Sequence, residues 1–236
     1  MSVRRDGAST AYERYLHTDE LLSLQRDAEG RVDPDEMIFI VVQQSSELWL
    51  KLIAYEMESA VSATRSDAVL PAVRHLRRVH SYLVNLMGQL DALDHIPPWS
   101  YQRIRTQLKD GSGFSSPGWS STRRQARALG EEFTAFMARR AVGLHEVYTR
   151  HTEFEDLYQL AESLIDLDSA CMLWRTRHLK VVERMVGVDA VGVAGTPIHV
   201  LAKLSTERLY PELWRIRSQL TSEAGEYFAT EPTPAP

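Results

Sequence analysis

The chain has 236 residues, a formal net charge of -5 and 44% hydrophobic residues, which is enough for a substantial core. The acidic balance, with no basic run longer than two arginines, argues against a nucleic-acid surface or a polybasic membrane surface. Cys171 is the single cysteine, which excludes an intramolecular disulfide and a cysteine-rich zinc site. We find neither a secretory leader nor a run of about 18 apolar residues that would span a membrane, so we expect a cytoplasmic protein.

The N-terminal half predicts three helices. Residues 10–25 favour a short helix whose leucines face inward. A second helix should begin near Asp33, where acidic side chains complement the helix dipole, and run to about Thr64. Its first half, residues 37–42, is apolar almost all round, so we expect a deeply buried helix. Residues 67–93 repeat apolar side chains at helical spacing and predict an amphipathic helix.

The C-terminal half continues this pattern around two loops. Glycine and serine dominate residues 109–118, and a second loop is expected over residues 187–197. Functional groups often lie on such loops. The remaining segments predict helices at about residues 99–109, 121–150, 154–187 and 197–226. We therefore predict an all-α helical bundle in which residues 1–230 form a single domain and residues 231–236 a disordered tail.

One histidine lies within an apolar stripe of the 154–187 helix. Spacing by three and four residues puts His178 on the same helix face as its apolar neighbours. The stripe comprises Leu157, Leu160, Leu164, Leu167, Cys171, Trp174, His178, Val181 and Met185. An imidazole on a buried face costs desolvation free energy unless its nitrogens find partners. Spacing alone leaves two interpretations open: a core histidine bonded to a neighbouring carbonyl, and a metal ligand.

Other polar residues interrupt apolar faces or precede loops. Gln43 lies on the apolar face of the second helix, as a hydrogen-bonded core amide would. Tyr101 and Arg105 share a helix face just before the glycine loop, where a guanidinium could hold a carboxylate; a surface arginine is the alternative. In that loop, Ser112 and Gly113 would let backbone N–H groups approach a ligand, although a plain turn has the same composition.

Four motifs follow one another along the chain. They are Tyr12-Glu-Arg-Tyr15-Leu with Leu21-Leu22; Asp35-Glu-Met-Ile-Phe39-Ile with Ser46-Glu-Leu-Trp-Leu-Lys51; Tyr101 and Arg105-Thr-Gln-Leu108 with Ser112-Gly113-Phe114; and Leu173-Trp-Arg-Thr-Arg177-His178 with Val182-Glu-Arg-Met-Val-Gly187. In order and nearly in register, these motifs resemble tryptophan 2,3-dioxygenase. The resemblance covers most of the chain.

The resemblance implies an all-α protein with heme b buried between helices, ferrous in its active form, and O2 as co-substrate. It implies that His178 is the proximal iron ligand. Trp174, Ser112 and Gly113 would join His178 in binding the heme. Members of the family are usually homotetramers, so a homo-oligomer built as a dimer of dimers is expected.

The resemblance also implies an amino-acid substrate with an indole ring. Phe39 and Tyr101 would line the indole pocket, and Arg105 would bind the substrate carboxylate. Tyr12 would reach in from a neighbouring subunit. The residues expected to contact substrate are Tyr12, Phe39, Tyr101, Arg105, Ser112, Gly113 and Gly192.

The chain departs from the family pattern on the substrate side. Gln43 stands where the family carries a distal histidine, and an amide can form hydrogen bonds but cannot act as a base. Residues 191–194 replace the family's Gly-Thr-Gly-Gly loop, so the threonine hydroxyl is lost at Gly192. Ile104 replaces an aromatic residue, and the segment from Phe114 to Trp174 is shorter than in typical members.

We therefore expect a heme-dependent oxygenase that oxidises the indole C2–C3 bond of L-tryptophan or of a modified tryptophan, such as β-methyltryptophan, in specialised metabolism. One or two oxygen atoms would be inserted. Phe39, Leu50 and Trp119 would form an apolar pocket that excludes water. Gln43 would hydrogen-bond either the indole N–H or the bound oxygen. The alternatives are an ordinary tryptophan 2,3-dioxygenase giving N-formylkynurenine, a heme-binding gas sensor, and a helical interaction protein without a cofactor.

Overall fold

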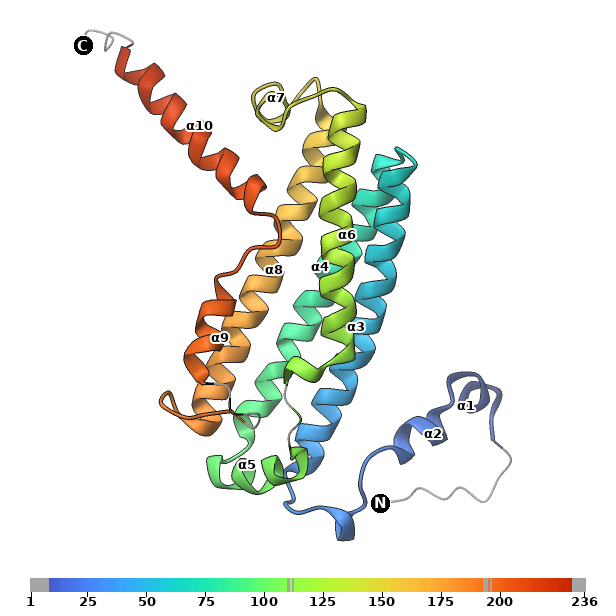
Figure 1. The fold of residues 1–236 in the computed structure, drawn as a ribbon. Helices are drawn as coiled ribbons and strands as arrows, with labels where there is room; N and C mark the ends of the chain where they lie inside the picture. Colours follow the sequence, from blue (N-terminus) through green and yellow to red (C-terminus); the bar gives the residue numbers. More distant parts are fainter. Residues whose placement is uncertain (1–8, 110, 112, 193–194, 196, 231–236) are drawn as a thin grey trace, which may run out of the picture.

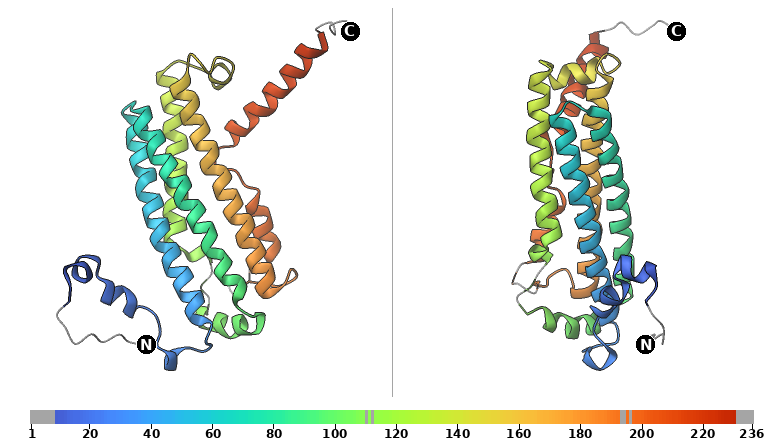
Figure 2. Two further views of the ribbon diagram at one scale, coloured as in Figure 1. Left: turned by 180° about the vertical axis from the view of Figure 1, so that it is seen from behind. Right: turned by 90° about the vertical axis from the view of Figure 1, so that its right-hand side faces the viewer.

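Four long helices run side by side as a bundle (Figure 1). They are α3 (Glu36–Arg65), α4 (Val69–Gly88), α6 (Pro117–Arg139) and α8 (Glu155–Val186). In this computed structural model, which describes residues 9–109, 111, 113–192, 195 and 197–230, α3 packs against α4 and α6, and α4 packs against α8. Figure 2 shows the same arrangement from two further sides. The all-α prediction is confirmed.

The predicted apolar stripe of α8 is the buried side of that helix. Leu157, Leu160, Leu164, Leu167 and Val181 have no exposed surface, and Cys171 and Met185 are at most 5% exposed. Each such leucine contributes about 2 kcal/mol through the apolar area it buries. Burial also raises the pKa of the Cys171 thiol to about 12, so the thiol stays protonated and unreactive.

Shorter elements connect and flank the bundle. At one end, the 3₁₀ helix η2 (Gln89–His95) leads from α4 into α5 (Pro98–Arg105), which contacts α3 and α8 (Figure 1). The 3₁₀ turns η3 (Thr106–Leu108) and η4 (Gly113–Ser115) then lead to α6. At the other end, α7 (Leu144–Thr149) joins α6 to α8. Beyond α8, α9 (Ile198–Ser205) lies along that helix and α10 (Pro211–Thr230) projects from the bundle (Figure 2).

Three segments predicted as single helices are each broken. Residues 10–25 divide into α1 (Ala11–Leu16) and α2 (Thr18–Ser23) because His17 has a left-handed backbone, with φ 52°. The predicted 121–150 helix ends at Arg139, after which Ala141 has φ 52°. Residues 197–226 divide at residues 206–210, and Pro211 begins the second helix, at a first position where no backbone N–H is needed.

The N-terminal segment with α1 and α2 stands away from the bundle (Figure 1). Neither helix contains a buried residue, and Leu22 is 71% exposed. The expectation that these leucines face inward is therefore wrong for the single chain. The segment is attached through Gln25, whose Nε2 donates a hydrogen bond to Gln44 Oε1 at 2.6 Å, and η1 (Ala28–Gly30) then leads into α3.

The first half of α3 is less buried than predicted. Of residues 37–42, Val42 is buried at 6% exposure while Val41 is 45% exposed, and the main core begins only at Leu50. Among the described residues, α3 is the helix that is long and apolar enough to cross a membrane by length and composition. The core helix of a helical bundle meets the same criterion, so this property adds nothing to the interpretation.

A buried carboxylate on α8 fixes the segment that joins α9 to α10. Asp168 is fully buried and accepts hydrogen bonds from the backbone N–H of Leu209 at 2.9 Å and of Tyr210 at 3.2 Å. Its Oδ2 also accepts from Trp214 Nε1 at 2.8 Å. Buried donors and a buried charge satisfy one another here, and removing the carboxylate would leave three donors without an acceptor.

We predict that Asp168→Ala lowers the free energy of unfolding by about 3 kcal/mol, because the stranded donors keep their desolvation cost. Urea unfolding followed by circular dichroism measures this. Asp166→Ala is the matched control, because Asp166 is exposed on the same helix; it should change stability by less than about 0.5 kcal/mol. Equal effects of the two substitutions would contradict the proposed anchoring.

Candidate functional site

A second apolar cluster lies at the end of the bundle that α5 closes, and three of the predicted site residues border it. Its buried members are Val42, Leu90, Leu93, Ile96, Ile104, Val181 and Met185. Phe39, Tyr101 and Trp174 are partly buried against them. We call this group the end cluster. It joins side chains from α3, α5 and α8, so motifs far apart in the sequence meet in one place.

His178 lies on α8 between Trp174 and Val181, two residues that contact the end cluster. Its ring is partly buried, and neither ring nitrogen forms a hydrogen bond with any described residue. Burial lowers the pKa of His178 to about 4, so the imidazole is neutral near pH 7. A neutral imidazole without a protein partner is the form that binds a metal.

The Trp174 indole is stacked on the His178 ring. Their centroids are 5.0 Å apart and the planes differ by 7°. Trp174 in turn contacts Trp119 of α6, at 4.4 Å between ring centroids. Trp174 Nε1 is buried without a hydrogen-bond partner among the described residues, which leaves one donor for an acceptor that the described chain does not supply.

The same contacts correct the predicted apolar pocket of Phe39, Leu50 and Trp119. Trp119 packs on Trp174, beside His178, while Phe39 packs on Tyr101 of α5. Leu50 is 1% exposed and belongs to the main core. The three side chains therefore do not form one pocket. Helical spacing could not reveal this because Trp119 lies on α6, whereas Phe39 and Leu50 lie on α3.

The two arginines of the Trp-Arg-Thr-Arg-His motif hold α8 to its surroundings. Arg175 donates to the carbonyl of Glu207 at 2.8 Å, beyond the end of α9. Arg177 forms ion pairs with Asp91 at 2.8 Å and Asp94 at 2.6 Å, both in η2. The helix turn that carries His178 is thus held from two sides. Helical periodicity did not predict these contacts with Glu207, Asp91 and Asp94.

The predicted substrate side contains an aromatic pair and a guanidinium. The rings of Phe39 and Tyr101 are 6.0 Å apart between centroids, and burial raises the pKa of Tyr101. Arg105 donates to Gln102 Oε1 at 3.2 Å and to the carbonyl of Val191 at 3.2 Å. Both acceptors are neutral, and no carboxylate in the described part of the chain forms an ion pair with Arg105. Its positive charge is available to an anionic group.

The remaining predicted site residues lie in different environments. Gln43 is exposed and has no hydrogen-bond partner among the described residues, so the interpretation as a satisfied core amide is wrong. Gly192 follows Val191 directly, in the loop that Arg105 contacts. Gly113 is exposed in η4, and Ser112 lies outside the described residues. Tyr12 is 69% exposed on α1, and Figure 1 shows that α1 stands away from the bundle of its own chain.

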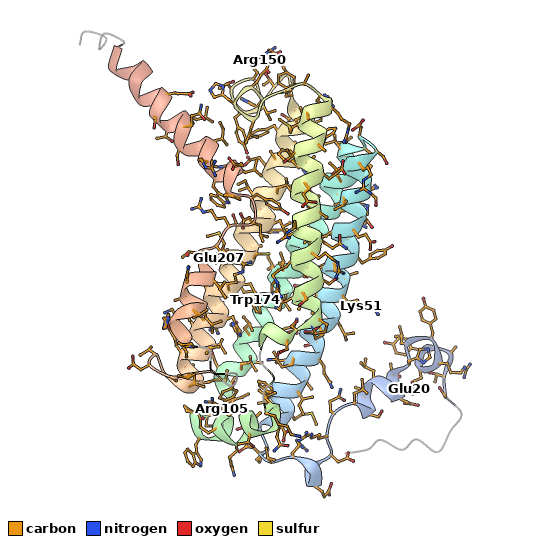
Figure 3. The ribbon with its side chains drawn as sticks, in the orientation of Figure 1. Glu20, Lys51, Arg105, Arg150, Trp174 and Glu207 are labelled. Carbon is orange, nitrogen blue, oxygen red and sulfur yellow. The ribbon has the colours of Figure 1, made fainter. Side chains whose placement is uncertain are left out.

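Figure 3 labels Trp174 on α8 and Arg105 on α5, both in the half of the bundle that α5 closes. Two surface hollows of about 250 and 270 Å³ lie elsewhere. One is lined by residues of α4 and α8 such as Arg77 and Asp166, and the other by residues 28 and 31–34. Neither includes a predicted site residue.

Comparison with known proteins agrees with the motifs. The family model described as tryptophan 2,3-dioxygenase matches residues 2–131 and 118–220. Tryptophan 2,3-dioxygenase of Bordetella parapertussis is 30% identical over 261 aligned residues, covering 89% of this chain and 91% of the relative. The Bacillus thuringiensis (strain Al Hakam) enzyme is 30% identical, and that of Polaromonas naphthalenivorans 29%; each match covers 89% of this chain and 92% of the relative. The chain belongs to the tryptophan 2,3-dioxygenase family.

Proposed function

We propose that this protein is a heme-dependent dioxygenase that uses O2 to open the indole C2–C3 bond of L-tryptophan, giving a product of the N-formylkynurenine type. One observation carries the proposal: the end cluster brings the helix turn of His178 and the helix of Arg105 together. The names of the relatives favour L-tryptophan over the modified tryptophan that the departures at Gln43 and Gly192 suggested.

The side chains around His178 fit a heme. Its neutral imidazole has no protein partner, and a single such ligand suffices when a macrocycle supplies the other ligands of the iron. Trp174 offers a stacked face to that imidazole and an unpaired buried N–H. Apolar residues of the end cluster provide the dry surroundings that a porphyrin needs. His178 would hold the iron, and Trp174 would fix the plane of the imidazole.

When bound, ferrous heme would supply the activation of O2. The protein's own contribution is to bind and orient the substrate. Arg105 would pair with the substrate carboxylate, while Phe39 and Tyr101 would pack against the indole and exclude water. Gln43 cannot take up a proton, so the proposed chemistry proceeds without a base at that position, and Gln43 would only donate or accept a hydrogen bond.

We further propose that the active form is a homo-oligomer in which Tyr12 approaches the site of a neighbouring subunit. Two observations support this. The segment with α1 and α2 stands away from its own bundle, and its large apolar side chains are uncovered, with Tyr15 84% and Leu24 63% exposed. An exposed group of apolar side chains of this kind is typical of a protein–protein contact.

Heme binding tests the assigned ligand. Protein reconstituted with heme should show a Soret band, and His178→Ala should abolish it because the proposed iron ligand is removed. His80→Ala, on the exposed side of α4, is the control and should bind heme like the parent protein. Retention of an unchanged Soret band by His178→Ala would refute the assignment.

Turnover tests the reaction. The reduced, heme-loaded protein is mixed with L-tryptophan and isotope-labelled O2, and the product is analysed by mass spectrometry. We expect two labelled oxygen atoms in the product, because a dioxygenase inserts both. One labelled atom would indicate a monooxygenase that needs a reductant. Heme binding without any product from L-tryptophan or β-methyltryptophan would favour the gas sensor.

Substrate binding tests Arg105. Arg105→Met should weaken L-tryptophan binding to the heme-loaded protein about tenfold or more, because a charge-assisted pair with the carboxylate is lost. Optical titration gives the Kd. Tryptamine, which lacks the carboxylate, should bind parent and variant alike. Arg184→Met, at an exposed position of α8, controls for loss of positive charge; an equal loss of affinity there would contradict the proposed pairing.

A further inference from the structure

The first turn of α6 is pressed against α3 more closely than an ordinary side chain would allow. A Cβ added to Gly118 would lie 2.6 Å from the Cβ of Leu50 and 2.7 Å from a carboxylate oxygen of Glu47. Only glycine fits at this crossing without a shift of one helix. The distance between the two helices is therefore fixed at the point where α6 begins.

Glu47 forms the polar part of this contact. Its carboxylate accepts a hydrogen bond from the hydroxyl of Ser116, the N-cap residue of α6, and another from the backbone N–H of Gly118 at 2.9 Å. The Ser116 hydroxyl oxygen accepts in turn from the backbone N–H of Trp119 at 3.0 Å. A carboxylate at a helix N-terminus satisfies unpaired N–H groups and interacts favourably with the helix dipole.

The residue positioned by this network is Trp119, which is linked to His178 through Trp174. Trp119 lies directly after Gly118, its ring contacts Trp174, and Trp174 is stacked on the His178 imidazole. Glu47 is one helix turn after Gln43 on α3. No other described carboxylate contacts the first turn of α6.

We infer that Glu47 is a positioning residue: by fixing the start of α6 it places Trp119 on Trp174 and thereby sets the orientation of the His178 imidazole. The inference rests on the proposed role of His178. It concerns this chain's own aromatic contacts, however, and these exist without the cofactor. A residue that acts on a metal ligand through its neighbours typically changes metal affinity while leaving the fold intact.

Glu47→Gln tests the inference. The amide keeps the size of the side chain but has one acceptor oxygen and an NH2 group that cannot accept from the second donor. Near-ultraviolet circular dichroism of the heme-free protein reports the Trp119–Trp174 pair, with Trp119→Phe as the reference for its loss. We expect Glu47→Gln to reduce this signal and to weaken heme binding about tenfold. Glu58→Gln, the same substitution at an exposed position of α3, should leave both unchanged.

Gly118→Ala disturbs the same contact while keeping the carboxylate, and it should reproduce both effects. It decides the question if Glu47→Gln does not fold. The inference is overturned if either folded variant keeps the parent's near-ultraviolet signal and heme affinity, or if Glu58→Gln changes them equally. A protein that binds no heme at all refutes the proposed function, while the near-ultraviolet comparison still shows whether Glu47 orders the tryptophan pair.

Discussion

Burial of one face of α8 is the constraint on which the rest of the molecule depends. Every turn from Leu157 to Leu167 places a side chain with no exposed surface in the core. Because successive turns of a helix cannot rotate independently, this burial also directs Trp174 and His178 towards the interior. Desolvation of an imidazole is unfavourable in itself, and the apolar contacts of the same helix outweigh that cost.

The five consecutive residues of the Trp-Arg-Thr-Arg-His motif contact several different elements of the fold. Trp174 stacks on His178 and meets α6, Arg175 holds the chain after α9, and Arg177 holds η2. Only His178 would touch the iron directly. The two arginines hold the backbone of the same turns from both sides of the helix. This limits movement of the imidazole.

The periodicity of the sequence predicted the features that are determined within a single helix. The boundaries of α8 and its buried face follow from the spacing of Leu160, Leu164 and their neighbours, and the resemblance of the motifs identified the family. Features that are determined by contacts between helices were not predicted. The contact between Trp119 and Trp174, the attachment of Arg105 to Val191 and the exposure of Gln43 result from tertiary packing, which no local pattern encodes. The breaks at His17 and Ala141 were missed because both residues have a left-handed backbone, and neither position carries the glycine or asparagine that usually signals one.

The hydrogen bond from Arg105 to the carbonyl of Val191 also links two events in thermodynamic terms. A guanidinium has five N–H donors, and the contacts with Gln102 and Val191 leave others free, so a carboxylate can bind without displacing the loop. The Val191 carbonyl and the bound carboxylate would then both interact with the guanidinium of Arg105. If the contact with the loop increases the affinity of Arg105 for a carboxylate, binding of the carboxylate must stabilise the contact with the loop by the same free energy. Under the proposed pairing of Arg105 with the substrate carboxylate, residues in the connection between α8 and α9 would therefore contribute to the affinity for the amino acid.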